Sequence, residues 1–346
     1  MFTMSVTLAH GSGGEKTQEL LTRLILSKVP LDLARTEGGH GLDILDDGAI
    51  IKLGDGKYLV ITVDSYTVSP PVFPGGDIGK LAACGTLNDL AAMGAEPLAV
   101  LDSIVVEEGV SIDFVEKITE SMLRVLKEEN VPVIGGDLKV MPRGQLDKIL
   151  ITMTGVGIAE KPIIDKELRP GDKIVVTGPI AEHGAAILAA QQGIDIEKFD
   201  LKSDCACLLR PMLRLCRKYR DAIHAARDPT RGGLATVLNE WARYGDYVIL
   251  IEEEKIPIRP PVRKFCEMLG IDPLYLACEG VMVLAVSPEA ADEVVQELHS
   301  MGFENASIIG EVRSTSRFSK IVVCKTATGG LRIVEPLKSS LVPRIC

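Results

Sequence analysis

Apolar residues recur along the chain at two spacings, which predict a mixture of helices and strands. Spacings of three and four residues predict helices over residues 18–28, 78–93, 112–129, 182–192, 205–219, 232–244 and 288–301. Short apolar runs predict strands over residues 58–63, 98–106, 149–158, 173–177, 247–251 and 281–286. Both halves of the chain mix the two kinds of element. The predicted fold class is therefore α/β or α+β, in two mixed domains.

The domain division follows from the chain length and from the gap between the two sets of elements. A chain of 346 residues is long enough for two domains of roughly 100–200 residues each. We expect an N-terminal domain over residues 1–160 and a second α/β domain over residues 161–335. Residues 336–346 contain two prolines, two serines and no regular period, which indicates an extended, flexible tail. Most chain ends of this kind are only frayed termini.

Charge and cysteine content restrict the partners and the compartment. The chain has 48 acidic residues against 38 Lys and Arg, a formal charge of −10, which argues against nucleic acid and anionic membranes as partners. Its start lacks a signal-peptide pattern, and no apolar run approaches about 20 residues. The eight cysteines include no Cys-x-x-Cys pair. We therefore expect a cytoplasmic protein with neither a disulfide framework nor a zinc ribbon.

The glycine-rich segments fall short of the standard nucleotide-binding motifs. Residues 75–80 imitate a P-loop, but Pro74 replaces its first glycine and Leu81 replaces its Ser or Thr. Residues 11–14 and 155–157 each lack part of the dinucleotide-binding fingerprint. A Walker-type or Rossmann-type enzyme is therefore disfavoured.

Aspartates stand instead at the ends and turns of the predicted elements. They are Asp46 and Asp47 before a strand, Asp64 after a strand, Asp89 in a small-residue helix, Asp137 after Gly135 and Gly136, and Asp228 before Pro-Thr-Arg-Gly-Gly. One such aspartate is usually a turn or cap residue. The whole set, together with Lys139, favours Mg²⁺-bound phosphate chemistry, because proteins hold Mg²⁺ with carboxylates and substrate phosphates. Thr230, a candidate helix N-cap, adds backbone N–H groups for an anion.

These segments also carry a family resemblance that covers nearly the whole chain. The motifs are Asp46-Asp47-Gly48-Ala49, Val63-Asp64-Ser65, Asn88-Asp89-Leu90-Ala91-Ala92-Met93-Gly94-Ala95, Gly135-Gly136-Asp137-Leu138-Lys139, Arg169-Pro170-Gly171-Asp172 and Arg227-Asp228-Pro229-Thr230-Arg231-Gly232-Gly233. In this order they resemble the ATP-using superfamily of aminoimidazole ribonucleotide synthetase, selenophosphate synthetase and thiamin monophosphate kinase.

Three further segments resemble one family within that superfamily, the HypE hydrogenase maturation factors. They are His10-Gly11-Ser12-Gly13-Gly14, Ala277-Cys278-Glu279-Gly280 and Pro343-Arg344-Ile345-Cys346. Selenophosphate synthetases carry a reactive cysteine or selenocysteine in the N-terminal glycine loop. Residues 10–15 contain none, which argues against that activity.

The resemblance implies a reaction on the last residue. In the family, HypF transfers a carbamoyl group to the C-terminal cysteine, here Cys346. ATP then drives dehydration of the thiocarboxamide to a thiocyanate, whose cyanide goes to iron held by a HypC–HypD complex. ATP and Mg²⁺ are the implied cofactors. The superfamily also dimerises through its N-terminal domain, and strands 58–64 and 98–106 are candidates to pair across a two-fold axis, so we expect a homodimer.

The resemblance also assigns roles to individual residues. Asp47, Asp89 and Asp228 would bind Mg²⁺; Asp64, Asn88, Gly135, Gly136, Asp137 and Thr230 would bind the nucleotide; Cys346, Lys139 and Glu279 would be catalytic. Lys139 would neutralise charge on the transferred phosphoryl group. Glu279, in a nearly apolar segment, would be the base. The structural alternative for Lys139 and Glu279 is an ion pair across the domain interface.

Two other functions remain open from the sequence. One is a small-molecule ATP-dependent kinase or synthetase of the same fold, in which the tail is incidental. ATP hydrolysis that depends on a small metabolite, and not on Cys346, would favour it. The other is a non-catalytic nucleotide-binding scaffold for metallocentre assembly. ATP binding without turnover would favour that function.

Overall fold

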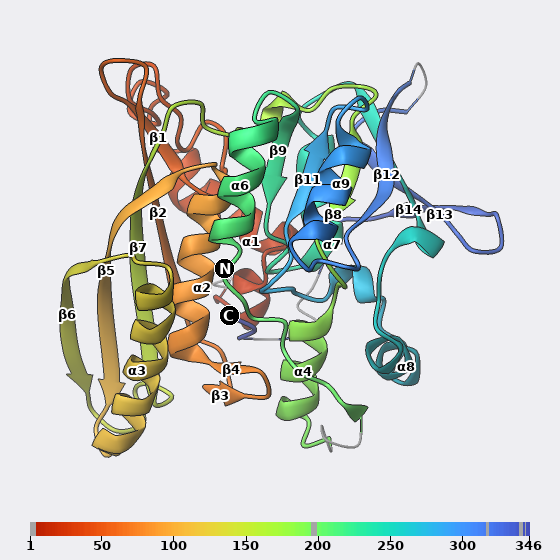
Figure 1. Cartoon of the computed structure of the whole chain (residues 1–346). Coiled ribbons are helices and arrows are strands. Elements are labelled where there is room, and N and C mark those ends of the chain that lie inside the picture. Colours follow the sequence, from red (N-terminus) through yellow and green to blue (C-terminus); the bar gives the residue numbers. More distant parts are fainter. Residues whose placement is uncertain (1–4, 195–198, 316–317, 339–341, 343) are drawn as a thin grey trace.

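Two β-sheets organise the chain in the computed structural model (Figure 1). The structure describes residues 5–194, 199–315, 318–338, 342 and 344–346. Strands of the first sheet lie between residues 49 and 159, and strands of the second lie between residues 173 and 334. One continuous buried apolar cluster joins the two halves. The mixed architecture confirms the predicted fold class.

The first sheet has five strands. Across the sheet their order is β1 (Ala49–Lys52), β2 (Tyr58–Tyr66), β7 (Ile149–Ala159), β5 (Glu96–Glu107) and β6 (Val133–Met141). Strands β5 and β6 run parallel, and the other neighbours run antiparallel. A small hairpin, β3 (Val72–Phe73) with β4 (Gly76–Asp77), leads into the first long helix. Before the first sheet come η1 (Leu8–Gly11), α1 (Glu15–Leu21) and η2 (Thr22–Leu26), and the helix predicted over residues 18–28 overlaps the end of α1 and all of η2.

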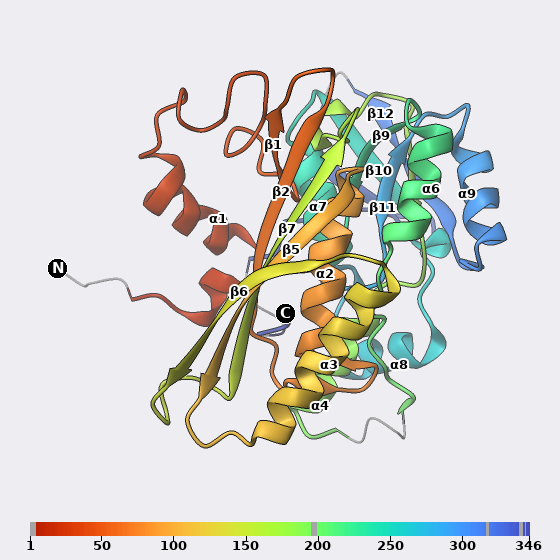
Figure 2. The ribbon, with the colours of Figure 1, turned by 60° about the vertical axis from the view of Figure 1, so that its left-hand side comes forward.

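Helices α2 (Ile78–Ala92) and α3 (Ile112–Glu128) cover one face of this sheet (Figure 2). Helix α2 starts where the Asp77 carboxylate accepts a hydrogen bond from the backbone N–H of Lys80, an N-cap. Its residues are nearly all buried, because their small side chains let the helix pack against the sheet, α3 and the second half of the chain. Helix α3 is amphipathic and buries Ile118, Met122, Val125 and Leu126.

The other face of the first sheet leaves apolar side chains in solvent. Val63 and Leu101, in register on either side of Thr154, are 60% and 38% exposed. At the edge strand β6, Leu138 and Val140 are 63% and 68% exposed on the opposite face, in register with the buried Ile104 and Val106. Exposed apolar surface of this extent on a sheet marks an interaction surface.

The second sheet has seven strands. Their order is β14 (Leu331–Val334), β13 (Ile321–Lys325), β10 (Tyr247–Glu252), β12 (Ser307–Ser314), β8 (Lys173–Val176), β11 (Val283–Val286) and β9 (Ile223–Arg227). Its helices are α4 (Glu182–Gln191), α6 (Leu209–Tyr219), α7 (Gly233–Ala242), α8 (Pro260–Leu269) and α9 (Ala291–Ser300), with short turns η3 (Asp165–Glu167), η4 (Glu253–Lys255) and η5 (Pro273–Tyr275). Strand β9 is an edge strand, and it lies at the junction with the first half of the chain (Figure 1).

Two predicted strand ends are wrong. Strand β2 continues to Tyr66, so Asp64 lies inside the strand. Strand β6 continues through the two glycines to Met141, so Asp137 also lies inside a strand. In both segments, main-chain pairing with the neighbouring strand continues past the polar residue that suggested the end.

Two elements of the second half also differ from the prediction. The helix predicted from residue 205 begins at Leu209, because the N–H groups of Ala206 and Leu208 donate to Glu279 O and Asn88 Oδ1 instead. Strand β9 was not predicted. All five of its residues are buried, and a short buried run of this composition has no alternating pattern.

The predicted boundary between domains, at residues 160 and 161, falls between the last strand of the first sheet and the first strand of the second. We retain the division into residues 1–160, 161–335 and 336–346 as a proposal. Of the predicted tail, residues 339–341 and 343 lie outside the described part of the chain. Within the described residues, no helix combines the length and the apolar character that a membrane crossing needs.

Candidate active site

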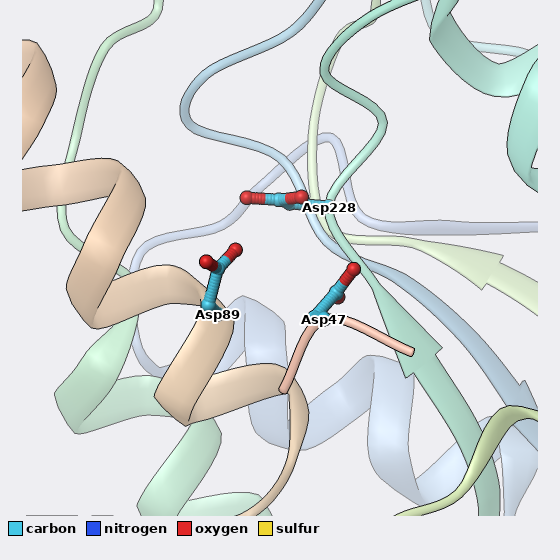
Figure 3. A group of neighbouring side chains, drawn as sticks. All are labelled: Asp47, Asp89 and Asp228. Carbon is cyan, nitrogen blue, oxygen red and sulfur yellow. The ribbon is translucent and has the colours of Figure 1, made fainter. Parts of the chain in front are cut away.

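Three carboxylates meet at the junction of the two halves. Asp47 precedes β1, Asp89 lies in the last turns of α2, and Asp228 follows β9. One oxygen of each lies within 4.8 Å of the others, and the three side chains point toward a common centre (Figure 3). The structure therefore brings together the three residues assigned to Mg²⁺, which come from positions up to 181 residues apart.

Burial makes this cluster costly without a cation. Asp89 and Asp228 are 7% and 5% exposed, and burial followed by the neighbouring carboxylates raises the pKa of both well above the ordinary value. The buried Oδ2 of Asp47 has no hydrogen-bond partner among the described residues. Thr62 Oγ1 donates to Asp89 Oδ2 at 2.5 Å and holds that side chain in place. A hard divalent cation fits this set of oxygen donors.

Arg227, the last residue of β9, fixes Asp47 from the other side. Its Nε donates to Asp47 Oδ1 at 2.8 Å, and its Nη2 donates to Leu45 O at 2.6 Å. Its Nη1 lies 2.6 Å from Glu240 and 3.2 Å from Asp165. Removing one partner of such a buried network would leave an uncompensated charge. The network therefore holds the turn before β1 against the second sheet.

A pocket of about 840 Å³ surrounds the carboxylates. Asp46, Asp64, Thr230 and Arg231 line it with the three clustered aspartates, and residues 33–36 and 48–51 add apolar surface. Asp64 reaches the pocket from inside β2, and burial raises its pKa. Of the residues predicted to bind nucleotide, Asp64 and Thr230 therefore lie at the pocket.

The β6 residues do not reach this pocket. Gly135, Gly136, Asp137 and Lys139 pair with β5 at the far edge of the first sheet. Three strand spacings, about 14 Å in all, separate β6 from β2. Asp137 and Lys139 form an ion pair at 2.6 Å with side chains 54% and 64% exposed. Within one chain, these four residues therefore lie away from the clustered aspartates, and their nucleotide-binding and catalytic roles remain predictions.

Asn88, predicted to contact the nucleotide, has structural hydrogen bonds in the folded chain. It is fully buried, and both ends of its amide are occupied by protein groups. Its Nδ2 donates to Ala206 O at 3.0 Å, and its Oδ1 accepts from Leu208 N at 2.7 Å. A second contact joins Nδ2 to Glu279 O at 3.4 Å. Asn88 thus fixes the segment that carries Glu279.

Glu279 is a buried carboxyl with a free oxygen. It is 1% exposed, and its Oε1 has no hydrogen-bond partner in the described part of the chain. Burial, followed by the charge of Asp228, raises its pKa well above the ordinary value. Its backbone N–H donates to the Asp204 carboxylate at 3.2 Å. Lys139 is ion-paired to Asp137, so the alternative of an interdomain pair between Lys139 and Glu279 is wrong.

The described end of the tail packs against the protein, whereas the sequence suggests a free end. Thr67 donates to Cys346 O from its backbone N at 2.9 Å and from its Oγ1 at 3.0 Å. His183 Nε2 lies 2.8 Å from Ile345 O, and Arg344 pairs with Asp147 at 2.5 Å. These contacts join residues 162–279 positions apart in the chain.

The docked tail brings the Cys346 thiol near charged side chains of the candidate active site. Burial raises the pKa of this thiol to about 12. The Arg231 guanidinium opposes the rise, and the carboxylates of Glu279, Asp64 and Asp228 add to it. The docked cysteine is therefore a neutral thiol that lies among the candidate catalytic residues.

Replacing His183 by alanine should release the tail. Burial lowers the His183 pKa to about 4, below the ordinary 6.5, so the stability that the neutral ring contributes is complete above pH 6.5 and is lost as the pH falls toward 4. Loss of its hydrogen bond to Ile345 O costs about 1 kcal/mol, or roughly fivefold in the undocked population. At pH 8, alkylation of Cys346 should accelerate by that factor, because the released thiol regains an ordinary pKa.

His299→Ala is the matched control, since His299 Nε2 also lies within hydrogen-bond distance of a backbone carbonyl, Ala306 O at 2.9 Å, far from the tail. Peptide mapping after iodoacetamide treatment gives the rate at Cys346 in each variant. Equal rates in wild type and His183→Ala would exclude His183 as a tail contact in solution.

Arg231, His183, Thr67 and Asp147 had no assigned role in the sequence-based site. Arg231 carried the only local signal, since it belongs to the Asp-Pro-Thr-Arg-Gly-Gly motif. The other three are ordinary residues at loops, strand ends and helix starts. Their contacts with the tail are seen only in the folded chain.

The AIR synthase related protein N-terminal domain matches residues 45–159, and the corresponding C-terminal domain matches residues 169–323. Carbamoyl dehydratase HypE of Rhodobacter capsulatus is 40% identical over 347 aligned positions, which cover 99% of this chain and 98% of that protein.

Two solved structures show the same fold over most of the chain. HypE in the HypE–HypF complex has a TM-score of 0.82 and 35% identity, covering 94% of this chain and all of that one. HypE in complex with ATP has a TM-score of 0.80 and 38% identity, covering 98% of this chain and all of that one. The full-length identity and the two matching domains together establish that the chain belongs to the HypE family of AIR synthase related proteins.

Proposed function

We propose that this protein is a carbamoyl dehydratase that acts in the maturation of nickel–iron hydrogenases. It uses ATP to dehydrate an S-carbamoyl group on its own Cys346 to a thiocyanate. The observation that carries the proposal is the docked tail, which places Cys346 among Glu279, Asp64, Asp228 and Arg231. HypE relatives named carbamoyl dehydratase, and one solved with ATP, support it.

The chemistry explains why ATP is needed. An amide oxygen is a poor leaving group. When the carbamoyl oxygen attacks the γ-phosphorus, the bond from that phosphorus to the ADP oxygen breaks and ADP leaves. A base then removes the nitrogen protons, the C–O bond breaks with its electron pair on phosphate, and the carbon–nitrogen triple bond forms. Overall, S-carbamoyl cysteine and ATP give cysteine thiocyanate, ADP and phosphate.

The residues of the site would have three roles. Asp47, Asp89 and Asp228 would hold Mg²⁺, which would neutralise phosphate charge when bound. Asp64 and Thr230 would lie beside the phosphates. Glu279 would be the base, because a carboxylate with a raised pKa is a stronger proton acceptor than an ordinary one.

The first and last steps of this reaction each require a protein partner. HypF would supply the carbamoyl group, as the HypE–HypF complex of a relative supports. The cyanide would pass to iron held by HypC–HypD. Since the docked thiol is half-buried and neutral, the tail would leave its docked position for carbamoylation and for cyanide transfer.

A homodimer would cover the exposed apolar face of the first sheet. Strands β2 and β5 present Val63 and Leu101 on that face, and β6 presents Asp137 and Lys139 in register with it. Pairing two copies there would bury the apolar residues. It would also bury Lys139. Because Lys139 lies away from the pocket of its own chain, any contribution of Lys139 to phosphoryl transfer requires the second copy.

Light scattering at micromolar concentration should therefore give the mass of two chains. Leu101→Asp should shift the protein toward one chain, because it places a charge in the contact. Leu331→Asp, at an exposed leucine of β14, should remain dimeric as a control. A monomeric wild type would contradict the expected assembly.

ATP consumption tests the proposed reaction. Protein carbamoylated by HypF should release one phosphate per carbamoyl group, and uncarbamoylated protein should release little in the same time. Phosphate release that depends on a small metabolite and is unaffected by Cys346→Ala would instead identify a small-molecule kinase or synthetase. ATP binding without turnover in the carbamoylated protein would identify a scaffold.

A further inference from the structure

Arg231 is an unpaired guanidinium at the active-site pocket. It lies on the turn between β9 and α7, three residues after Asp228, and its side chain lines the pocket that contains the aspartates. Solvent reaches it there. Within the described residues, it forms no hydrogen bond or ion pair at its side chain, although acidic groups lie around it.

Arg227, four residues earlier, shows the opposite arrangement. Its guanidinium is bonded to Asp47, Glu240, Asp165 and a backbone carbonyl, so its donors are committed to the protein. A guanidinium presents five N–H donors in a planar fork that matches oxyanions. The donors of Arg231 remain available for a bound oxyanion.

The charges around Arg231 connect the thiol with the metal cluster. The groups that influence its pKa include the Cys346 thiol, which is neutral when docked, and the carboxylates of Asp64 and Glu279. The N-terminal glycine loop also packs on its backbone: a Cβ at Gly13 would lie 2.7 Å from Arg231 Cβ and 2.8 Å from Arg231 O. Gly13 itself has a φ of +79°, which favours glycine. The glycine loop thus packs closely against the backbone of this arginine.

We propose that Arg231 is a catalytic residue that binds the oxygen of the S-carbamoyl group on Cys346. It stays on that oxygen as the carbamoyl group becomes a phosphate ester. This inference rests on the proposed function. No proton leaves the guanidinium. Its N–H groups donate first to the carbamoyl oxygen and then also to oxygens of the transferred phosphoryl group, until the C–O bond breaks and phosphate departs.

An arginine suits this position better than a second metal or a lysine. The negative charge that develops on the phosphoryl oxygens spreads over several atoms, and a planar fork contacts two of them at once. The aspartates would be occupied by Mg²⁺, so Arg231 would be the cation left to face the substrate oxygen. It would also orient the carbamoyl group with its nitrogen toward Glu279.

The test is a single-turnover measurement on the full-length protein. Wild type, Arg231→Ala and Arg231→Lys are carbamoylated with HypF and carbamoyl phosphate, then mixed with ATP and Mg²⁺, and the loss of one water is followed by intact mass. ATP binding is measured separately by calorimetry. Arg263→Ala is the control, because Arg263 is an exposed arginine of α8 with no side-chain ion pair or hydrogen bond among the described residues.

Arg231→Ala should accept the carbamoyl group and bind ATP within about threefold of wild type, yet lose water on the order of 100- to 1000-fold more slowly. Arg231→Lys should recover part of the rate, and added guanidinium should partly rescue Arg231→Ala. Dehydration by Arg231→Ala within threefold of wild type would overturn the proposal, and so would failure of this variant to become carbamoylated. If carbamoylated wild type itself never loses water, the proposed function fails before the role of Arg231 arises.

Discussion

Replacing Asp89 by asparagine should lower Mg²⁺-dependent ATP turnover on the order of 100-fold, about 2.7 kcal/mol of activation free energy. Asp89 is the most informative of the three carboxylates, because among the described residues its side chain forms no ion pair and accepts only the hydrogen bond from Thr62. Asp47→Asn would also break the ion pair to Arg227, so its effect would combine two causes.

The fold should survive this change. Asp89 is buried beside other carboxylates, so a neutral side chain of the same shape removes repulsion rather than a stabilising contact. The asparagine oxygen can still accept the hydrogen bond from Thr62. Circular dichroism and thermal unfolding verify the fold, and Asp113→Asn, at the exposed first turn of α3, is the matched control. Undiminished Mg²⁺-dependent turnover in Asp89→Asn would remove this residue from the metal site.

Replacing Glu279 by glutamine should stop the second half of the reaction. The variant should accept the carbamoyl group and bind ATP, but its dehydration should slow by about 100- to 10,000-fold, as expected when a general base is lost. Glutamine keeps the shape, and the main-chain contacts of residue 279 with Asn88 and Asp204 do not involve the carboxyl group. Carbamoylated protein should therefore accumulate in the presence of ATP.

Glu267→Gln, at an exposed glutamate of α8, is the control for this experiment and should behave as wild type. Time-resolved intact mass distinguishes the carbamoylated species from the product. A Glu279→Gln variant that dehydrates at the wild-type rate would mean that another group takes the nitrogen protons.

The sequence predicts the fold class and the three clustered aspartates well, for identifiable reasons. Long helices such as α2 and α3 have strong periodic patterns or clear caps. Asp228 follows β9, a strand that the sequence pattern does not predict. Family motifs assign Asp47 and Asp89 to the cluster. The structure adds a contact that no local pattern contains, because Arg227 donates a hydrogen bond to Asp47, 180 residues earlier in the chain.

The errors come from features that depend on distant partners. The glycines before Asp137 suggest a strand end, but pairing with β5 carries β6 on to Met141. The hydrogen bonds of Asn88 to Ala206 and Leu208 cross 118 and 120 residues, so no local pattern predicts them. The tail has no periodic pattern, and its docking depends on Thr67 and His183, whose positions only the folded chain defines.

The most direct test of the central claim follows the mass of the intact chain. With HypF, carbamoyl phosphate and then ATP, the wild-type mass should rise by one carbamoyl group and afterwards fall by one water, with both changes at Cys346. Cys346→Ala should show neither change, while it keeps its fold and binds ATP. Carbamoylation and dehydration that persist in Cys346→Ala would contradict the claim that this terminal cysteine carries the reaction.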